Sequence, residues 1–125
     1  MASALLLACG LLSKYDDEIM RITFLDVGQG DSALIEFPGR KIMIIDGGGT
    51  FSDIFDIGRA VVAPYLWNKG IRSIDYMVLS HPQTDHAEGL VYLLDKFHVG
   101  EVWTNGMISP ATYLFDRGIR DKGIR

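Results

Sequence analysis

Three side chains that commonly bind metals lie close together in the sequence: His81, Asp85 and His86. Imidazole nitrogens and carboxylate oxygens are ligands for zinc, and they also suit manganese or iron. A metal held by such ligands can activate water for hydrolysis, so the spacing predicts a metal site. The structural alternative is that Asp85 caps a helix while the histidines are ordinary surface residues. Residue types and spacing alone leave both interpretations open.

The residues around this cluster predict a strand followed by a helix. The stretch 74–79 is short, apolar and rich in β-branched and aromatic residues, which is typical of a buried strand. The stretch 89–97 has apolar residues at helical spacing, and they form one stripe: Leu90, Leu93, Leu94 and Phe97. The cluster is therefore expected at the carboxyl end of a strand, where open α/β sheets place their ligand sites. The third histidine, His98, is expected at the end of this helix and is not counted as a ligand.

Three further strands are expected before the cluster, at 19–27, 32–37 and 42–46. Because short turns join them, they predict an antiparallel start to a mixed sheet. Gly28 and Gly30 lie in the first turn, where glycine allows a positive φ without steric cost. Close approach of the backbone to a bound substrate or metal is the functional alternative for these glycines.

A helix is expected over 54–67, with Pro64 ending or kinking it. Its predicted buried face consists of Ile57, Ala60, Val61 and Pro64. A strand over 99–104 follows the central helix, and Ser109-Pro110 predicts the start of another helix. That last helix is expected to be lined by Tyr113, Leu114 and Ile119.

Composition limits the classes of function. A chain of 125 residues is long enough for one domain with a hydrophobic core. The net charge of −4 argues against a tight nucleic-acid-binding module, although a metal-dependent nuclease remains open because its metal supplies positive charge. Cys9 is the single cysteine, which excludes an internal disulfide and a cysteine-based zinc cluster.

Residues 1–18 are expected to lie apart from the domain, which is predicted to span 19–125. The first twelve residues are apolar but fewer than the roughly 20 that a membrane-spanning helix needs. Three interpretations remain: the cut end of a transmembrane helix, a signal segment whose Cys9 resembles a lipoprotein processing site, and a buried first segment. Residues 14–18 are polar and are expected to be a linker.

Three motifs in order resemble those of metallo-β-lactamase-type hydrolases, and of the ComEC family of bacterial competence proteins in particular. They are Phe-Leu-Asp-Val-Gly-Gln-Gly-Asp-Ser at 24–32, Ile-Ile-Asp-Gly-Gly at 44–48, and the cluster at 81–86. The resemblance covers about residues 21–106. It implies an α/β fold with a mixed sheet, specifically the N-terminal half of an αββα sandwich, with the other half beyond Arg125.

The resemblance also implies roles for individual residues. His81 would bind one divalent metal, zinc or manganese, and Asp85 and His86 would bind a second. Asp85 would also orient the attacking hydroxide as the catalytic carboxylate. Asp46 would orient ligands without touching the metal, with an Asx turn as its structural alternative. Gln83 occupies a position where the family usually has His or Asp, which would weaken one of the two metal positions.

The substrate implied by the resemblance is a phosphodiester, namely DNA handled during uptake by a membrane-associated bacterial protein. A lipoprotein and a cytoplasmic protein remain open, as does the oligomeric state. Two other functions also remain: a hydrolase of a small ester, thioester or lactam, and a degenerate, non-catalytic domain. On its own the chain is expected to bind metal weakly and to be inactive, because three ligands divided between two metals complete neither site.

Overall fold

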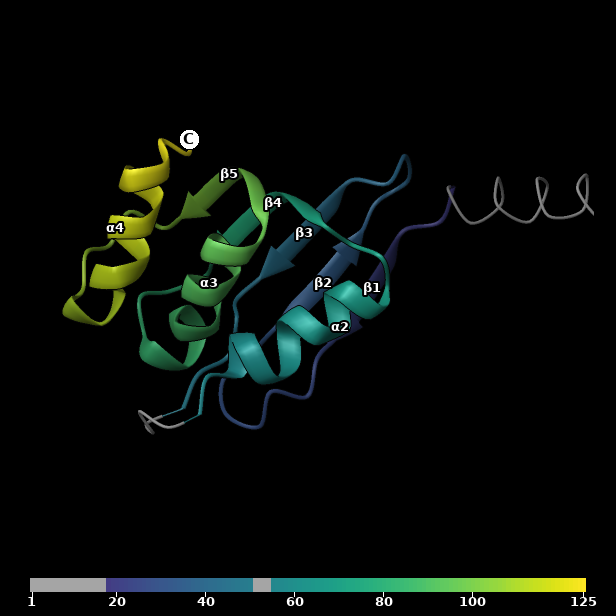
Figure 1. Cartoon of the computed structure of the whole chain (residues 1–125). Helices are drawn as coiled ribbons and strands as arrows, with labels where there is room; N and C mark the ends of the chain where they lie inside the picture. The colour runs from purple at the N-terminus through teal and green to yellow at the C-terminus, as the bar shows by residue number, and fades with distance from the viewer. Residues whose placement is uncertain (1–17, 51–54) are drawn as a thin grey trace, which may run out of the picture.

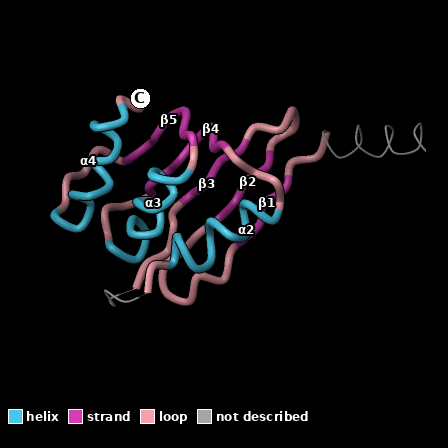
Figure 2. Tube along the Cα trace, in the orientation of Figure 1, coloured by secondary structure: helices cyan, strands magenta, loops and turns pink. Residues whose placement is uncertain are grey.

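The computed structural model describes residues 18–50 and 55–125, so nearly all of the expected N-terminal segment 1–18 lies outside it. The described residues form one mixed sheet with helices packed on one of its faces (Figures 1 and 2). The predicted α/β class with a mixed sheet is confirmed. No helix in this part of the chain combines the length and apolar character needed to cross a bilayer.

The sheet of the described residues has five strands in the order of the sequence. They are β1 (Arg21–Phe24), β2 (Ala33–Glu36), β3 (Ile42–Ile45), β4 (Ser73–Leu79) and β5 (His98–Thr104). The first three are antiparallel neighbours, as the short turns predicted, while β3, β4 and β5 run parallel. Parallel neighbours need helical crossovers, and these crossovers carry the chain from the end of one strand to the start of the next.

The crossover from β3 to β4 corrects the expected helix 54–67. It consists of a π-helical turn η1 (Gly58–Val62) followed by α2 (Ala63–Asn68). The expected end at Pro64 is wrong, because the helical segment continues past it to Asn68, with the π-helical turn directly before it. The π turn also changes which residues face inward. Of the predicted set only Ile57 is fully buried, and it is joined by Val62, Ala63 and Leu66; Ala60 is exposed, and Val61 and Pro64 are only partly buried.

The crossover from β4 to β5 is α3 (Thr84–Lys96), and it buries the stripe that the sequence predicted. Its leucines pack over the middle strands, whose fully buried residues include Leu34, Ile44 and Met77. Phe97 stacks on Trp67 with ring centroids 5.6 Å apart, which joins the ends of the two crossovers. Packing along its whole length therefore fixes where the first turn of α3 lies.

The chain continues through a short 3-10 turn, η2 (Pro110–Thr112), into α4 (Tyr113–Lys122). Ser109 is the expected N-cap, since its Oγ accepts a hydrogen bond of 3.2 Å from the Ala111 N–H. The predicted lining of α4 was partly wrong. Tyr113 and Leu114 are mostly exposed, while Phe115 is the fully buried residue that holds the helix against α3.

The sheet face away from the helices is apolar and uncovered in the described structure. Neighbouring strands align Phe24, Ala33, Ile45, Val78 and Trp103 in one row across the sheet. A second row contains Ile22, Ile35, Met43 and Tyr76 and ends at Glu101 on β5. Phe24 is 83% exposed and Trp103 is 47% exposed. Such a contiguous apolar surface is typical of a face that another protein layer covers.

Candidate metal centre

The predicted site residues lie at one edge of the sheet, where β3 and β4 end. Ile45 and Val78 are register partners in these parallel strands, so the residues that follow both strands are neighbours. The Asp46 N–H continues the pairing by donating to the Val78 carbonyl at 2.9 Å. His81 follows β4 after one residue, and the first turn of α3 then presents Asp85 and His86 at the same edge.

Asp46 is the buried anchor of the site, with 3% of its surface exposed. Its Oδ1 accepts a hydrogen bond of 2.8 Å from the Ser80 N–H, and its Oδ2 accepts one of 2.5 Å from the Ser80 hydroxyl. The same Oδ2 lies 2.8 Å from Nδ1 of His86. A carboxylate oxygen only accepts hydrogen bonds, so Nδ1 of His86 is the donor, and in the neutral imidazole Nε2 keeps its lone pair. Metal-binding histidines are commonly held in this way.

Ser80 extends this order to His81. Its one hydroxyl proton goes to Asp46, so its oxygen accepts the hydrogen bond from Nδ1 of His81 at 3.0 Å. In the neutral ring, Nε2 of His81 therefore also carries a lone pair. The two imidazole rings are adjacent, with centroids 3.8 Å apart. The Asp46 carboxylate thus sets the proton position of His86 and the Ser80 hydroxyl sets that of His81, which leaves both Nε2 atoms able to bind a metal.

Gln83 faces His81 across the predicted ligand position. Its Oε1 lies 3.2 Å from Nε2 of His81, and both atoms are acceptors under the proton assignment above. A cation between them would satisfy both, and so would a half-turn of the amide that places its NH₂ group toward the ring. Gln83 is therefore close enough to share a ligand with His81, although its amide oxygen is a weaker zinc ligand than imidazole.

Asp85 lies in the first turn of α3, while the N-cap position is occupied by Gln83. The alternative interpretation of Asp85 as the N-cap is therefore wrong. Its Oδ2 is 3.8 Å from Nε2 of His86, and its side chain is partly exposed. The helix dipole favours a carboxylate at this end of a helix.

Glycines allow the surrounding loops to close on the site. Gly30 has φ +79°, and a Cβ there would lie 1.7 Å from the Asp85 carbonyl oxygen. The turn interpretation of this glycine is confirmed by its positive φ, and the close approach seen here is to the backbone of α3; approach to a substrate or metal stays a prediction. On the other side, the Gly47 N–H donates to the His86 carbonyl at 2.8 Å. These contacts pin the first turn of α3 between two loops.

The remaining histidine is not part of this group. His98 is the first residue of β5, paired with Ser73 at the start of β4, so it lies at the opposite edge of the sheet. Ser80 and Asn105 are residues that the sequence analysis missed. The Asn105 side chain donates to the Ser80 carbonyl at 3.2 Å and supports the residue that links both histidines. Polar residues directly after two neighbouring parallel strands were the available signal.

The donor atoms present suit a divalent metal in kind and make up part of a coordination shell. Two imidazole nitrogens and one carboxylate are borderline and hard donors of the type that zinc and manganese accept. Within residues 18–50 and 55–125, no three His, Cys, Asp or Glu side chains are close enough together to hold a metal ion. The described residues therefore fit part of a metal site.

Comparison with known proteins adds independent evidence. The sequence matches the metallo-beta-lactamase superfamily over residues 25–118. It is 34% identical over 88 residues to ComE operon protein 3 of Bacillus subtilis, a match that covers 62% of this chain and 11% of that protein. It is 30% identical over 121 residues to ribonuclease Z of Clostridium beijerinckii, covering 97% of this chain and 31% of that protein.

A third relative is named as a subunit of a synthase. The chain is 30% identical over 85 residues to phosphoribosylformylglycinamidine synthase subunit PurL of Metallosphaera sedula, covering 60% of this chain and 12% of that protein. The chain thus spans at most 31% of the length of these three relatives. The expected similarity to the ComEC family is confirmed by the match to ComE operon protein 3. Since the family match covers most of the sequence and the fold agrees with it, the chain belongs to the metallo-β-lactamase superfamily.

Proposed function

We propose that this chain is part of a metal-dependent hydrolase and that His81, Asp85 and His86 are its metal ligands. Proteins of the metallo-β-lactamase superfamily typically bind divalent metals such as zinc. The observation that carries the proposal is the hydrogen-bonded chain from Asp46 through Ser80, which leaves Nε2 of both histidines with a lone pair. When bound, zinc or manganese would lower the pKa of a bound water and polarise the bond under attack.

The chain's own residues would prepare this chemistry. Asp46 holds the His86 ring and, through Ser80, the His81 ring, so little ordering remains to be done when the metal binds. Asp85 lies at the partly exposed rim, where its carboxylate can accept a hydrogen bond from a water and orient it as the nucleophile. His81 would serve one metal, and Asp85 with His86 a second.

The substrate that we propose is a phosphodiester of nucleic acid, and DNA in particular. Support comes from the similarity to ComE operon protein 3, a competence-type protein by the resemblance above, and to a protein named ribonuclease Z. The ComEC resemblance further suggests a bacterial, membrane-associated protein in which DNA is handled during uptake. The domain would span 19–125, with the remaining ligands supplied by residues outside this chain.

A second candidate function is a non-catalytic domain that keeps the fold. The observation that favours it is Gln83, whose amide can simply donate to His81 and close the ligand position without a metal. This candidate and the hydrolase share the same structure. They differ in whether both histidine Nε2 atoms contact a metal.

The test is a DNA-cleavage assay on a longer protein in which the coding sequence downstream of Arg125 is included. We expect manganese- or zinc-dependent cleavage that His86→Ala abolishes and His98→Ala leaves unchanged, since His98 lies at the other edge of the sheet. Gln83→His should raise metal affinity, because imidazole is the better ligand. Metal binding without cleavage of DNA would redirect the substrate to a small ester, thioester or lactam. Absence of metal from the longer protein would establish the non-catalytic candidate.

A further inference from the structure

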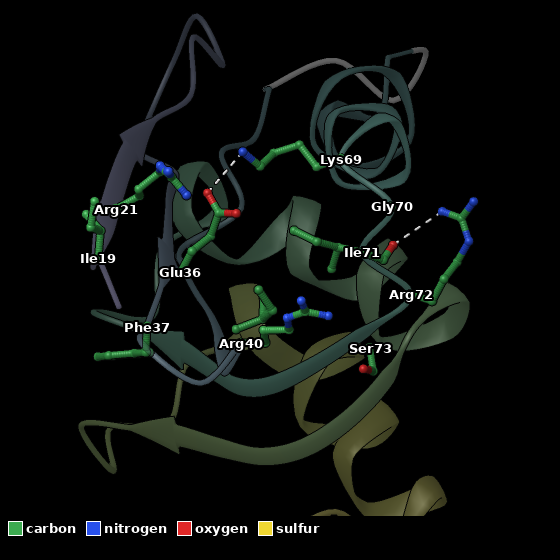
Figure 3. Close-up of a pocket in the computed structure, with 11 residues that line it drawn as sticks. Ile19, Arg21, Glu36, Phe37, Arg40, Lys69, Gly70, Ile71, Arg72 and Ser73 are labelled. Atoms are coloured by element: carbon green, nitrogen blue, oxygen red, sulfur yellow. Dashed lines mark hydrogen bonds and ion pairs between the residues drawn. The ribbon is translucent and has the colours of Figure 1, made fainter. Parts of the chain in front are cut away.

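A pocket of about 530 Å³ lies at the edge of the sheet opposite the histidine cluster (Figure 3). Its walls come from the start of β1, the turn between β2 and β3, and the segment that joins α2 to β4. The volume falls within the roughly 300–1,000 Å³ that is usual for small-molecule sites. Because three separate parts of the chain meet there, the fold itself defines the pocket.

Charge distinguishes this pocket from the rest of the chain. Four cationic residues line it, Arg21, Arg40, Lys69 and Arg72, against one carboxylate, Glu36. The whole chain has a net charge of −4, so the positive charge is concentrated here against the overall balance. Cations grouped in a concave surface attract anions more strongly than the same cations spread over an open surface.

The side chains are arranged around a common space. In Figure 3, Lys69 and Arg21 point toward Glu36 from two sides, Arg40 extends into the space between the walls, and Arg72 turns outward at the rim. The Lys69 Nζ lies 3.0 Å from Oε2 of Glu36, so this pair is neutral as a unit. The other three cations of the lining are arginines, and Nη1 of Arg72 donates to the Trp67 and Ile71 carbonyls at 3.3 Å each.

We propose that this pocket binds the phosphate groups of a ligand. A guanidinium presents paired N–H donors that match the oxygens of a phosphate. Arginine is therefore preferred where an anion is bound by two parallel hydrogen bonds. Glu36 would then set the strength of binding, because it holds Lys69 in place and also opposes the incoming negative charge. The phosphate could belong to a small nucleotide-like ligand or to a nucleic-acid backbone, which share this chemistry. The proposal does not depend on hydrolysis at the opposite edge.

The test is calorimetric titration of the 125-residue chain with inorganic pyrophosphate and, separately, with a five-nucleotide single-stranded DNA without terminal phosphates. Arg40→Gln should weaken binding by about fivefold or more, since it removes a charged donor from the pocket. Glu36→Gln should tighten binding by about threefold, because it removes the opposing charge at nearly constant shape. Arg117→Gln is the matched control, because this exposed arginine of α4 pairs with Asp121 outside the pocket.

The opposite signs of the Arg40 and Glu36 variants separate a binding site from a loss of folding. Tight binding of pyrophosphate alone would support the proposal with a small ligand, and tighter binding of the DNA would support it with a nucleic-acid backbone. Arg40 lies in an exposed turn, so the Arg40→Gln variant is expected to keep the native fold. Its thermal unfolding temperature, compared with that of the parent chain, checks this. The proposal is overturned if neither probe binds, or if Arg40→Gln and Arg117→Gln weaken binding equally.

Discussion

Ser80 connects the site residues to one another through its one hydroxyl group. The proton of this group goes to Asp46 and its oxygen accepts from His81, while its backbone N–H also donates to Asp46. Asp46 completes the set by accepting from His86. The positions of the protons on both imidazole rings are therefore set by Asp46 and Ser80, which are hydrogen-bonded to each other. This is how buried polar residues prepare a site before any ligand arrives.

Asp46→Asn should move the His86 proton from Nδ1 to Nε2. The new amide can donate to Nδ1, which favours the other tautomer and removes the lone pair that a metal needs. The left-handed φ of +57° at position 46 suits asparagine, so the fold should be retained. Nitrogen-15 shifts of the imidazole rings report the tautomer directly, and His98 serves as an internal control. An unchanged His86 tautomer would show that Asp46 does not fix this ring.

The sequence predicted which residues lie at the site better than it predicted the hydrogen bonds between them. The grouping of His81, Asp85 and His86 at one edge follows from a strand, a turn and a helix start, all of which have sequence signals. Ser80 was missed because a serine beside a strand end occurs often and has no spacing that marks it. The helix-capping alternative for Asp85 failed because the helix begins at Thr84, one residue before it.

The position of α3 is set by contacts between backbones. A Cβ at Gly89 would lie 2.0 Å from the Gly47 carbonyl oxygen, which is closer than any real contact. Gly58 packs against the same turn of α3, with its own hypothetical Cβ 2.3 Å from the Gly89 carbonyl oxygen. These glycines allow the helix to sit directly on the loop that carries Asp46. The helix thus delivers Asp85 and His86 to a fixed place.

Gly89→Ala should destabilise the fold by about 1–3 kcal/mol, because the extra methyl forces backbones apart. Gly118→Ala is the matched control in α4, where the added Cβ meets only the end of the Leu94 side chain at 3.3 Å. Alanine is favoured over glycine inside a helix by about 0.5–1 kcal/mol, so this control should be neutral or stabilising. Urea unfolding measures both. Equal stability of Gly89→Ala and the parent chain would contradict the proposed backbone contact.

An ion pair ties β3 to β4 at the edge away from the histidines. Burial alone would raise the pKa of the Asp75 carboxyl, but the hydrogen bonds from the Lys41 ammonium and the Ile42 N–H outweigh it and hold that pKa below its ordinary value of 3.8. Lys41 Nζ lies 2.6 Å from Oδ1 of Asp75. A carboxyl with a lowered folded-state pKa stabilises the fold above its unfolded pKa, and this contribution is lost as the pH falls through the folded value.

Asp75→Asn should therefore reduce the loss of stability on acidification. The free energy of unfolding of the parent chain should fall more steeply below about pH 4 than that of the variant. Asp95→Asn is the control, because the pKa of Asp95 is also lowered by a lysine, Lys96, but this pair is largely exposed and screened by water. Urea titrations at several pH values give the slopes. A parallel pH dependence for the parent and Asp75→Asn would refute the account.

The elements were predicted unevenly for physical reasons. The stripe on α3 follows helical periodicity, and burial against the sheet matches that periodicity closely. The segment before α2 was mispredicted because a π turn adds a residue to the helical repeat and rotates the buried face. Gly58, the first residue of that turn, packs closely against the backbone of α3, and this tertiary contact has no signal in the local sequence.

In the described part of the chain, one face of the sheet is covered by helices and the other is not. The resemblance implied half of an αββα sandwich, and an apolar sheet face without helices is what half a sandwich leaves open (Figure 1). The sequence predicted this architecture through the family motifs. Strand alternation alone would not have done so, because several strands are too short to show a clear period.

Phe24→Thr should reduce self-association of the chain without lowering its stability. Phe24 is 83% exposed on the apolar face, so its replacement removes surface that favours association and loses almost no buried contact. Ile108→Thr is the matched control, because Ile108 is 94% exposed but lies in the loop after β5. Sedimentation velocity at several concentrations measures the effect. Equal behaviour of the two variants would show that the sheet face does not drive association.

The most direct test of the metal site is an NMR titration of this chain with zinc, observed at its three histidines. We expect the ring signals of His81 and His86 to shift or broaden together, while the His98 ring at the opposite edge of the sheet stays unchanged. Binding is expected to be weak, because the described residues supply only part of a coordination shell. An equal response of all three histidines, or a response of His98 alone, would contradict the proposed site.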